Sequence, residues 1–305
     1  MKISVFTPTF NRGYIIKNLY DSLLLQTYKE FEWLIIDDGS EDNTEKICNS
    51  FLNEGIVDIK YIKQKNGGKH RALNNAVRNA QGELFFVVDS DDQLTGNALE
   101  RIAYYYHKIK DDDSIGGIFG VKALFSGKLP GDKLPFSQLK CSNLDFRYKM
   151  NIKGDMAEIF KTDILRKFPF PEYENERFCP EALVWNRIAQ HYKLFIFNEI
   201  IYLCDYLDDG LTRKIVRIRM ESAQASMDTY EELSHYPVPW LQKIKARINF
   251  WRFSFNTNMA FSKKIKRVSG AFYNLIAMPL GYLMHLRDKR TVSHLNIDAN
   301  QKNSK

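Results

Sequence analysis

Apolar residues in the first hundred positions occur in short runs that alternate between strand-like and helix-like spacing. Runs of apolar and β-branched residues predict strands at residues 2–7, 31–36, 56–62 and 84–88. Helices are predicted between them at residues 14–26, after a cap at Asp42 or Asn43, and at residues 69–80. Near-continuous apolar strands separated by helices are typical of a parallel sheet covered on both faces. The sequence therefore predicts a fold of the α/β class.

The pattern becomes less regular after about residue 110. Further strands are predicted at residues 116–125, 154–160, 194–197 and 200–203, and helices at residues 162–167 and 180–191. Residues 127–143 are rich in Gly, Pro and Lys and are predicted to form a loop. From residue 213 the chain is helical and basic, and Pro279 should kink or divide the last helix. We expect an α/β domain over residues 1–212 and a basic helical extension over residues 213–305.

Polar clusters stand at the ends of the first four predicted strands. They are Thr7-Pro8-Thr9, Asp37-Asp38-Gly39, residues 64–69 and residues 89–92. In an open parallel sheet, ligands bind at the carboxyl ends of the strands. The four clusters are therefore expected to line one crevice, and this crevice is the candidate site.

The acidic cluster carries the clearest chemistry, because Asp89, Asp91 and Asp92 directly follow a strand. Carboxylates this close repel one another unless a cation compensates them, and their oxygens are the hard ligands that Mg²⁺ and Mn²⁺ prefer. One Asp at a strand-to-helix turn is commonly a helix cap, but three within four residues are not explained in that way. We therefore predict a metal site that uses two or three of these carboxylates and shares the ion with the phosphates of a ligand.

Two further segments suit a nucleotide. Asp38 can accept hydrogen bonds from a base or a ribose, although an Asp-Gly turn explains segment 37–40 equally well when it is taken alone. Asn66-Gly67-Gly68-Lys69-His70-Arg71 places two glycines and cationic side chains at a helix start, where backbone N–H groups can bind a diphosphate. This segment is not a Walker sequence, and alone it does not establish a phosphate site.

Charge is unevenly distributed along the chain. The net charge is +7, but residues from 211 onward hold 17 Lys and Arg against 6 Asp and Glu, whereas residues 1–210 hold 27 and 31. A basic C-terminal third suits an anionic surface, either nucleic acid or lipid headgroups. The 4 cysteines and 6 histidines lack metal or redox spacing, and no apolar run predicts a signal peptide or a spanning helix. We expect a cytoplasmic protein with reduced thiols.

Four motifs together resemble a known family. VFTPTFNR, WLIIDDGSEDNT, NGGKHRALNNA and GELFFVVDSDD occur in the order and spacing of the inverting glycosyltransferases of family 2. The resemblance covers about residues 1–210, and its most specific part is the first 100. It implies the GT-A fold, a Rossmann-like, mostly parallel sheet flanked by helices. It further implies a nucleotide-binding half, residues 1–110, and an acceptor-binding half, residues 111–212.

The resemblance also implies roles for individual donor-side residues. Pro8 and Asp38 would line a uridine pocket, with Lys69 near the base or the diphosphate. Asp89 would approach the ribose. The metal ligand of the family's DxD motif would be Asp91, and Asp92 would share that duty.

Acceptor-side roles are implied by weaker matches. Glu181 stands where the family has its general base, although Ala182 replaces the Asp that often follows; a helix-start Glu stabilised by the helix dipole is the plain alternative. Asp155 matches a segment that contacts the donor or acceptor sugar, and a solvated loop residue explains it nearly as well. Residues 206–212 match a lid, from which Arg213 could reach the diphosphate.

The expected function is metal-dependent transfer of a sugar from a nucleotide-sugar donor, commonly UDP-linked, to a hydroxyl group. The expected acceptor is a saccharide or a polyprenyl-diphosphate-linked saccharide in bacterial surface polysaccharide synthesis. The basic extension would either lie on an anionic membrane surface, at the inner face of the cell membrane, or pack on the α/β domain or on a second copy in a homo-oligomer.

Three rival functions are weighed against this one. A nucleotidyltransferase would be expected to open with a Gly-rich phosphate loop, where this chain has Thr7-Pro8-Thr9-Phe10-Asn11-Arg12. A nucleic-acid-binding protein would leave the carboxylate clusters unexplained, so we expect no nucleic-acid partner. A scaffold that binds nucleotide sugars without catalysis is favoured only by Ala182.

Overall fold

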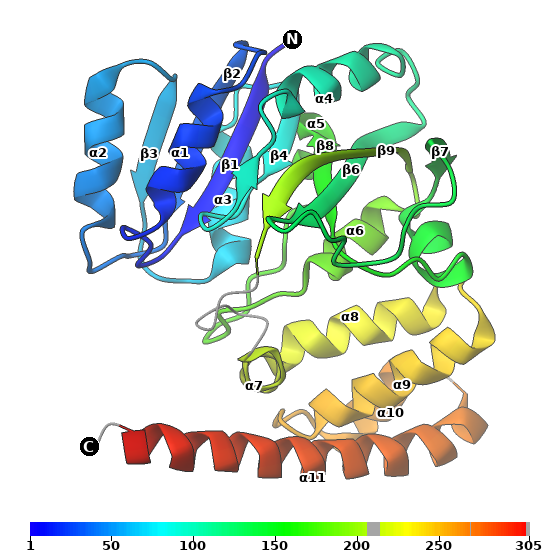
Figure 1. The fold of residues 1–305 in the computed structure, drawn as a ribbon. Helices are drawn as coiled ribbons and strands as arrows, with labels where there is room; N and C mark the ends of the chain where they lie inside the picture. Colours follow the sequence, from blue (N-terminus) through cyan, green and yellow to red (C-terminus); the bar gives the residue numbers. More distant parts are fainter. Residues whose placement is uncertain (206–213, 269, 303–305) are drawn as a thin grey trace. The chain divides into compact units, whose positions relative to one another are not determined.

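A mixed sheet occupies the centre of the first of two structural units (Figure 1). The computed structural model describes residues 1–205, 214–268 and 270–302, without the side chains of residues 271, 272 and 294–302. The first unit comprises Met1–Phe170 and Val184–Asp205, and the second comprises Pro171–Leu183 together with the helices from residue 214 onward. The lid expected at residues 206–212, and Arg213, lie outside the described residues.

The predicted parallel strands form one half of this sheet. They are β1 (Ile3–Thr9), β2 (Phe31–Asp37), β3 (Ile59–Lys63) and β4 (Leu84–Val87), in the order β3-β2-β1-β4. All seven residues of β2 are buried, because helices cover both faces of the sheet. The α/β fold that the apolar runs predicted is therefore confirmed.

Helices follow the strands in the first unit. They are α1 (Ile16–Leu24), α2 (Thr44–Glu54), α3 (Lys69–Asn79), α4 (Ala98–His107), α5 (Thr162–Lys167) and the short π-helix η1 (Asp145–Lys149). Leu19 of α1 and Ile102 of α4 share one core with Val5 and Trp33 of the sheet. Figure 1 shows α1 on one face of the sheet and α3 on the other.

The second half of the sheet is mixed. It consists of β8 (Met156–Lys161), β6 (Ile115–Leu124), β9 (Lys193–Cys204), β5 (Gln93–Leu94) and β7 (Gln138–Cys141). Strand β8 runs antiparallel between β4 and β6, whereas β9 runs parallel to β6. Both β5 and β7 pair antiparallel with β9.

Two sequence predictions for this half need correction. The segment 127–143, predicted as a loop, contains β7, because the edge of β9 supplies hydrogen-bond partners that a short polar strand does not signal by itself. The two strands predicted at 194–197 and 200–203 are one continuous strand, β9, which accommodates the intervening polar residues by register shifts against β6.

The second unit is helical from residue 214 onward. Its helices are α7 (Ile215–Glu221), α8 (Ala223–His235), α9 (Trp240–Ser254), α10 (Phe261–Arg267) and α11 (Ala271–Lys302). Phe250, Trp251 and Ala277 belong to its separate core. The helix α11 continues through Pro279 and is not divided there. In the part of the chain that the structure describes, no helix is long and apolar enough to cross a membrane.

Candidate functional site

The acidic cluster forms the turn between β4 and β5, at the carboxyl end of β4. Val88 still donates its N–H to the Phe6 carbonyl at 2.8 Å, and the chain then leaves the sheet. Tyr202 of β9 lies against this turn with its ring fully buried. Its hydroxyl accepts the Asp89 N–H at 3.0 Å and donates to Asp92 Oδ2 at 2.6 Å. One tyrosine therefore ties both ends of the turn to the sheet.

Three cationic side chains from different elements surround the carboxylates. Lys69, the first residue of α3, lies with its Nζ 2.6 Å from Asp89 Oδ1. Arg12, in the β1–α1 loop, places its guanidinium 4.0 Å from Asp91 Oδ2. Lys122 of β6 lies with its Nζ 4.0 Å from the centre of the Tyr202 ring. The site therefore combines negative and positive groups, as the binding of a metal together with a diphosphate requires.

The pKa values of the three aspartates diverge. Burial opposes ionisation of Asp89, but the charges of Lys69, Lys122 and Arg12 outweigh it and leave its pKa below the ordinary value. Burial and repulsion by Asp89 raise the pKa of Asp91. The same two causes raise the pKa of Asp92 to about 7, against the hydrogen bond from Tyr202 that lowers it. Two carboxylates thus carry negative charge that the protein compensates incompletely.

The glycine loop is organised around Asp38. Gly67 and Gly68 donate their backbone N–H groups to Asp38 Oδ1 and Oδ2 at 2.9 and 2.7 Å, and Gln64 Nε2 donates to Oδ1 at 2.8 Å. Gly68 adopts a φ of +95°, a conformation that glycine tolerates and that leads into α3. The two amides that the sequence suggested for a diphosphate are therefore hydrogen-bonded to Asp38, and Lys69 is the cationic group that this loop presents next to the acidic turn.

The β1–α1 loop is fixed in the same way by the loop after β2. Asn11 and Arg12 donate their backbone N–H groups to Ser40 Oγ at 2.8 Å and Thr44 Oγ1 at 3.0 Å. Pro8 lies in β1 opposite Ile36 of β2 and is half-buried. The ends of β1 and β2 are thereby locked together, and Pro8, Asp38, Lys69 and the acidic turn stand at the same edge of the sheet.

Asp155 lies in the first unit, in the turn before β8. It is exposed and lines a small hollow that also has Lys122, Lys153 and Asp132 in its wall. Gly154 makes this turn with a φ of +99° and packs closely on the facing loop. Because Lys122 contacts Tyr202 as well, the hollow adjoins the acidic turn.

Glu181 is the first residue of α6 (Glu181–Ile188). The boundary between the two units falls within this helix, so that Glu181 belongs to the second unit and the residues from Val184 onward belong to the first. Its side chain is half-buried, and so is that of the neighbouring Ala182. The assignment of Glu181 as the base stays a prediction.

The donor set of the acidic turn fits a hard divalent cation. Side chains of Asp89 and Asp91 are 34% and 21% exposed, so their oxygens can be reached from solvent. No group of three His, Cys, Asp or Glu among the described residues forms a complete metal site. Proteins commonly hold Mg²⁺ or Mn²⁺ by one or two carboxylates, while phosphates and water supply the other ligands.

Three site residues are missing from the sequence-based set. Tyr202 lies 110 residues along the chain from Asp92, and Lys122 lies 30 residues from it, with no motif around either of them. The pairing of β9 with β5, which directly follows the turn, and with β6 brings them to it. Arg12 lies inside the motif VFTPTFNR, so a sharper reading of that motif could have found it.

Solved structures share this fold. The chain resembles S. aureus TarS residues 1–349 in complex with UDP-GlcNAc, with a TM-score of 0.68, 18% identity, and coverage of 98% of this chain and 92% of that TarS fragment. It also resembles the mannosyltransferase PcManGT from Pyrobaculum calidifontis in complex with GDP-Man and Mn²⁺, with a TM-score of 0.58, 16% identity, and coverage of 94% and 87%. At these identities the likeness concerns the fold alone, and it confirms the GT-A architecture.

Curated relatives are bacterial glycosyltransferases. Glycosyltransferase GlyG of Streptococcus pneumoniae is 34% identical over 215 residues, which cover 66% of this chain and 69% of GlyG. The GalNAc(5)-diNAcBac-PP-undecaprenol beta-1,3-glucosyltransferase of Campylobacter jejuni is 28% identical over 223 residues, which cover 69% of this chain and 67% of that enzyme. In several other relatives the match spans only 24% to 37% of their length.

The family model for glycosyl transferase family 2 matches residues 4–162, which include β1 to β4, the acidic turn, β6 and β8. This range is more than half of the chain. Together with the match to GlyG, it shows that the chain is a glycosyltransferase and belongs to glycosyl transferase family 2.

Proposed function

We propose that this protein moves a sugar from a UDP-linked donor to a hydroxyl group of an acceptor, with inversion at the anomeric carbon. The observation that carries the proposal is the acidic turn after β4, where three carboxylates meet Lys69, Arg12 and Lys122. A nucleoside diphosphate and a divalent cation together match this mixture of charges, because each group on the ligand finds a partner of opposite sign. The UDP and UDP-GlcNAc bound by TarS support the choice of uridine.

Donor binding is proposed to use the ends of β1, β2 and β4. Pro8 and Asp38 would line the base pocket, where the Asp38 carboxylate already fixes the glycine loop. Asp89 would face the ribose. Lys69 would exchange part of its ion pair with Asp89 for the diphosphate, and Arg12 stands close enough to Asp91 to approach the same phosphates.

Asp91 is proposed as the main metal ligand, with Asp92 sharing the ion. Mn²⁺ or Mg²⁺ bound there would neutralise the charge that develops on the departing diphosphate. The raised pKa of both carboxylates supports this role, since burial and repulsion by Asp89 leave their negative charge in need of a cation. The Mn²⁺ in the PcManGT complex is a further reason to expect a divalent metal.

Transfer itself is proposed to be a single displacement. The acceptor oxygen forms a bond to the anomeric carbon while the bond from that carbon to the diphosphate oxygen breaks. Glu181 takes the proton of the acceptor hydroxyl, and the nucleoside diphosphate leaves with the bonding electron pair. Glu181 is the first residue of α6, and its side chain is half-buried.

The acceptor is proposed to be a saccharide, free or linked to a polyprenyl diphosphate, in bacterial surface polysaccharide synthesis. The undecaprenol-linked substrate in the name of the Campylobacter relative supports a lipid-linked acceptor. Asp155 would bind sugar hydroxyls in the hollow that adjoins the acidic turn. Such an acceptor would place the enzyme at the cytoplasmic face of the cell membrane.

The decisive experiment is turnover of a panel of UDP-sugars with Mn²⁺, with Mg²⁺ and with EDTA. We expect slow hydrolysis of one or a few donors, dependence on the metal, and a loss of at least 100-fold in Asp91→Ala. Glu181→Gln should bind the donor normally but transfer at least 100-fold more slowly to the acceptor. A nucleotide-sugar-binding scaffold, the alternative that Ala182 favours, would bind the donor without turnover in any variant. A nucleic-acid-binding protein would show neither binding nor turnover.

A further inference from the structure

The last long helix, α11, has two chemically different faces. The face packed toward α9 consists of residues at intervals of three or four: Asn274, Ala277, Gly281, His285 and Asp288, all of them buried. Gly281 is needed there, since a Cβ at this position would lie 2.6 Å from Trp251 Cβ. Asp288 accepts two hydrogen bonds from the Arg252 guanidinium of α9, at 2.5 and 2.9 Å. This face is complete within the second unit.

The opposite face of α11 is apolar and exposed. Ile276 and Leu283 stand two helical turns apart on it and are 52% and 61% exposed. Leu275 and Leu280 flank them, and Leu275 is 71% exposed. A row of large aliphatic side chains in water is unusual for a surface helix, which normally turns polar residues outward. The row therefore indicates an interaction surface.

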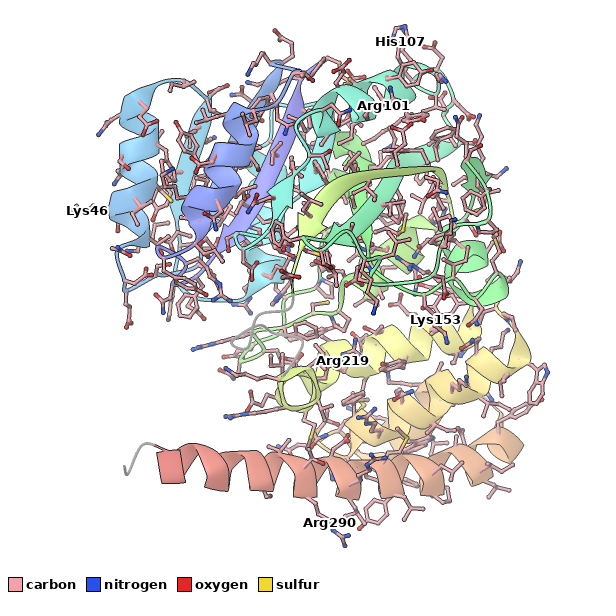
Figure 2. The ribbon with its side chains drawn as sticks, viewed as in Figure 1. Lys46, Arg101, His107, Lys153, Arg219 and Arg290 are labelled. Carbon is pink, nitrogen blue, oxygen red and sulfur yellow. The ribbon has the colours of Figure 1, made fainter. Side chains whose placement is uncertain are left out.

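Cations continue the same face. Arg290 follows Leu283 after two further turns, and Arg287 and Lys289 are exposed beside it. Figure 2 shows Arg290 pointing from α11 away from α8 and α9. These three residues make no ion pair within the described part of the chain, whereas Arg252 and Arg267 of the same unit are neutralised by acidic side chains. Their charge is thus available to a partner.

Helix α10 of the same unit carries exposed residues of the same two kinds. Phe261 and Ile265 are exposed one turn apart, and the Phe261 ring centre lies 5.7 Å from that of Trp251, which also contacts α11. Lys263 and Lys266 are exposed on the same short helix. Apolar side chains bordered by cations therefore occur on both elements.

We propose that the exposed face of α11 docks on an anionic lipid bilayer with the helix axis in the plane of the membrane. Aliphatic side chains would enter the boundary between headgroups and acyl chains, while Arg287, Lys289 and Arg290 contact lipid phosphates. This inference deepens the proposed function by naming the surface that holds the enzyme at its membrane. A second copy of the chain is the less suitable occupant, because self-pairing would bring two basic surfaces together without compensating charge.

Sedimentation of the full chain with vesicles tests the proposal. We expect binding to vesicles that contain phosphatidylglycerol, weak binding to phosphatidylcholine vesicles, and a decrease with added salt. Each cation near an anionic surface contributes about five-fold to the partition coefficient. The triple variant Arg287→Gln, Lys289→Gln, Arg290→Gln should therefore bind about 100-fold more weakly.

A matched control separates this surface from net charge. The control removes the same charge from exposed positions of the first unit, as the triple variant Lys46→Gln, Lys110→Gln, Lys128→Gln. Figure 2 shows Lys46 on α2. This variant should keep at least a third of the wild-type partition coefficient. A second test variant, Leu275→Gln, Leu280→Gln, Leu283→Gln, keeps the charge and should bind at least ten-fold more weakly. All these side chains are exposed, so the substitutions leave the packed cores intact.

Three outcomes would overturn the proposal. They are no binding of wild type to anionic vesicles, equal losses in the α11 and control variants, and self-association in solution that the leucine variant abolishes. Donor turnover in the absence of vesicles is measured on the same samples. Full turnover without vesicle binding refutes the docking surface alone, whereas vesicle binding without any turnover refutes the proposed function alone.

Discussion

Removal of one hydroxyl group, in Tyr202→Phe, tests how the acidic turn is held. That hydroxyl is buried, accepts the Asp89 N–H and donates to Asp92. Its pKa is raised well above the ordinary value by burial and by the charges of Asp89 and Asp92, so it stays protonated and can donate. Phenylalanine preserves the ring packing and deletes only the two hydrogen bonds.

The expected cost follows from what the deletion leaves unpaired. A hydrogen bond to a charged group contributes about 1.5–3 kcal/mol, and a buried N–H without a partner costs about 1–3 kcal/mol. Asp92 can relieve part of the loss by taking up a proton, since burial and Asp89 already raise its pKa to about 7. We therefore expect the free energy of unfolding to fall by about 2 kcal/mol, slightly below the lower end of the sum of these two costs.

Donor turnover should fall by more than the loss of folding stability explains. A turn that is free to shift by about 1 Å misplaces Asp91, and an error of that size costs about 100-fold in rate. The loss of turnover should be larger at pH 6.5 than at pH 8.5. Without the hydrogen bond from Tyr202 the pKa of Asp92 rises further, so less of this carboxylate is ionised at the lower pH. The assays are urea unfolding and donor turnover as a function of Mn²⁺ concentration and pH.

Tyr20→Phe is the matched control. Its hydroxyl donates to Glu54 Oε2 at 2.7 Å, between α1 and α2, and its ring is also buried. This variant should lose about 1 kcal/mol of stability and keep its turnover at every pH. The reasoning is refuted if Tyr202→Phe loses stability yet keeps the turnover, Mn²⁺ dependence and pH profile of the wild type, since the hydroxyl would then be structural only.

Three further predictions concern single positions. Asp91→Asn should abolish metal-dependent turnover and yet raise the melting temperature slightly. A carboxylate with a raised pKa destabilises the fold when it is ionised, and the amide removes that cost. A lower melting temperature would contradict this. Gly154→Ala should destabilise the chain by about 2 kcal/mol more than Gly127→Ala in urea unfolding. Both glycines have a positive φ, but only a Cβ at position 154 would meet neighbouring backbone, at 2.4 Å. Equal costs would refute the close contact. Native Cys48 should resist alkylation at pH 8, because burial raises the pKa of its thiol to about 12, and mass spectrometry should detect its adduct only after unfolding.

The parallel half of the sheet was predictable from local pattern. A strand covered on both faces must be apolar throughout, and β2 is buried over its whole length. Such runs stand out against the helices around them, so strands β1 to β4 were found with small errors at their ends. The site followed from the same logic, since parallel strands place their carboxyl ends at one edge.

The second half of the sheet was less accessible. Strand β7 is short, alternates exposed with half-buried residues, and exists because the edge of β9 is available to it. A local pattern cannot report a partner that lies more than fifty residues away. The same reason explains why β9 was divided at its polar residues: its pairing with β6 continues across them.

The sequence by itself determined the fold class, the four polar strand ends, the acidic turn of Asp89 to Asp92 and the basic surplus of the C-terminal third, because each of these depends on neighbouring residues. Only the tertiary structure decided which groups meet that turn. Tyr202 is 110 residues from Asp92, and their hydrogen bond exists because β9 pairs with β6 and with β5, the strand that directly follows Asp92. Likewise, apolar residues occur on several sides of α11, and packing on α9 decides which of them stay in water. Long-range pairing and burial are properties of the folded chain, and no local run of residues encodes them alone.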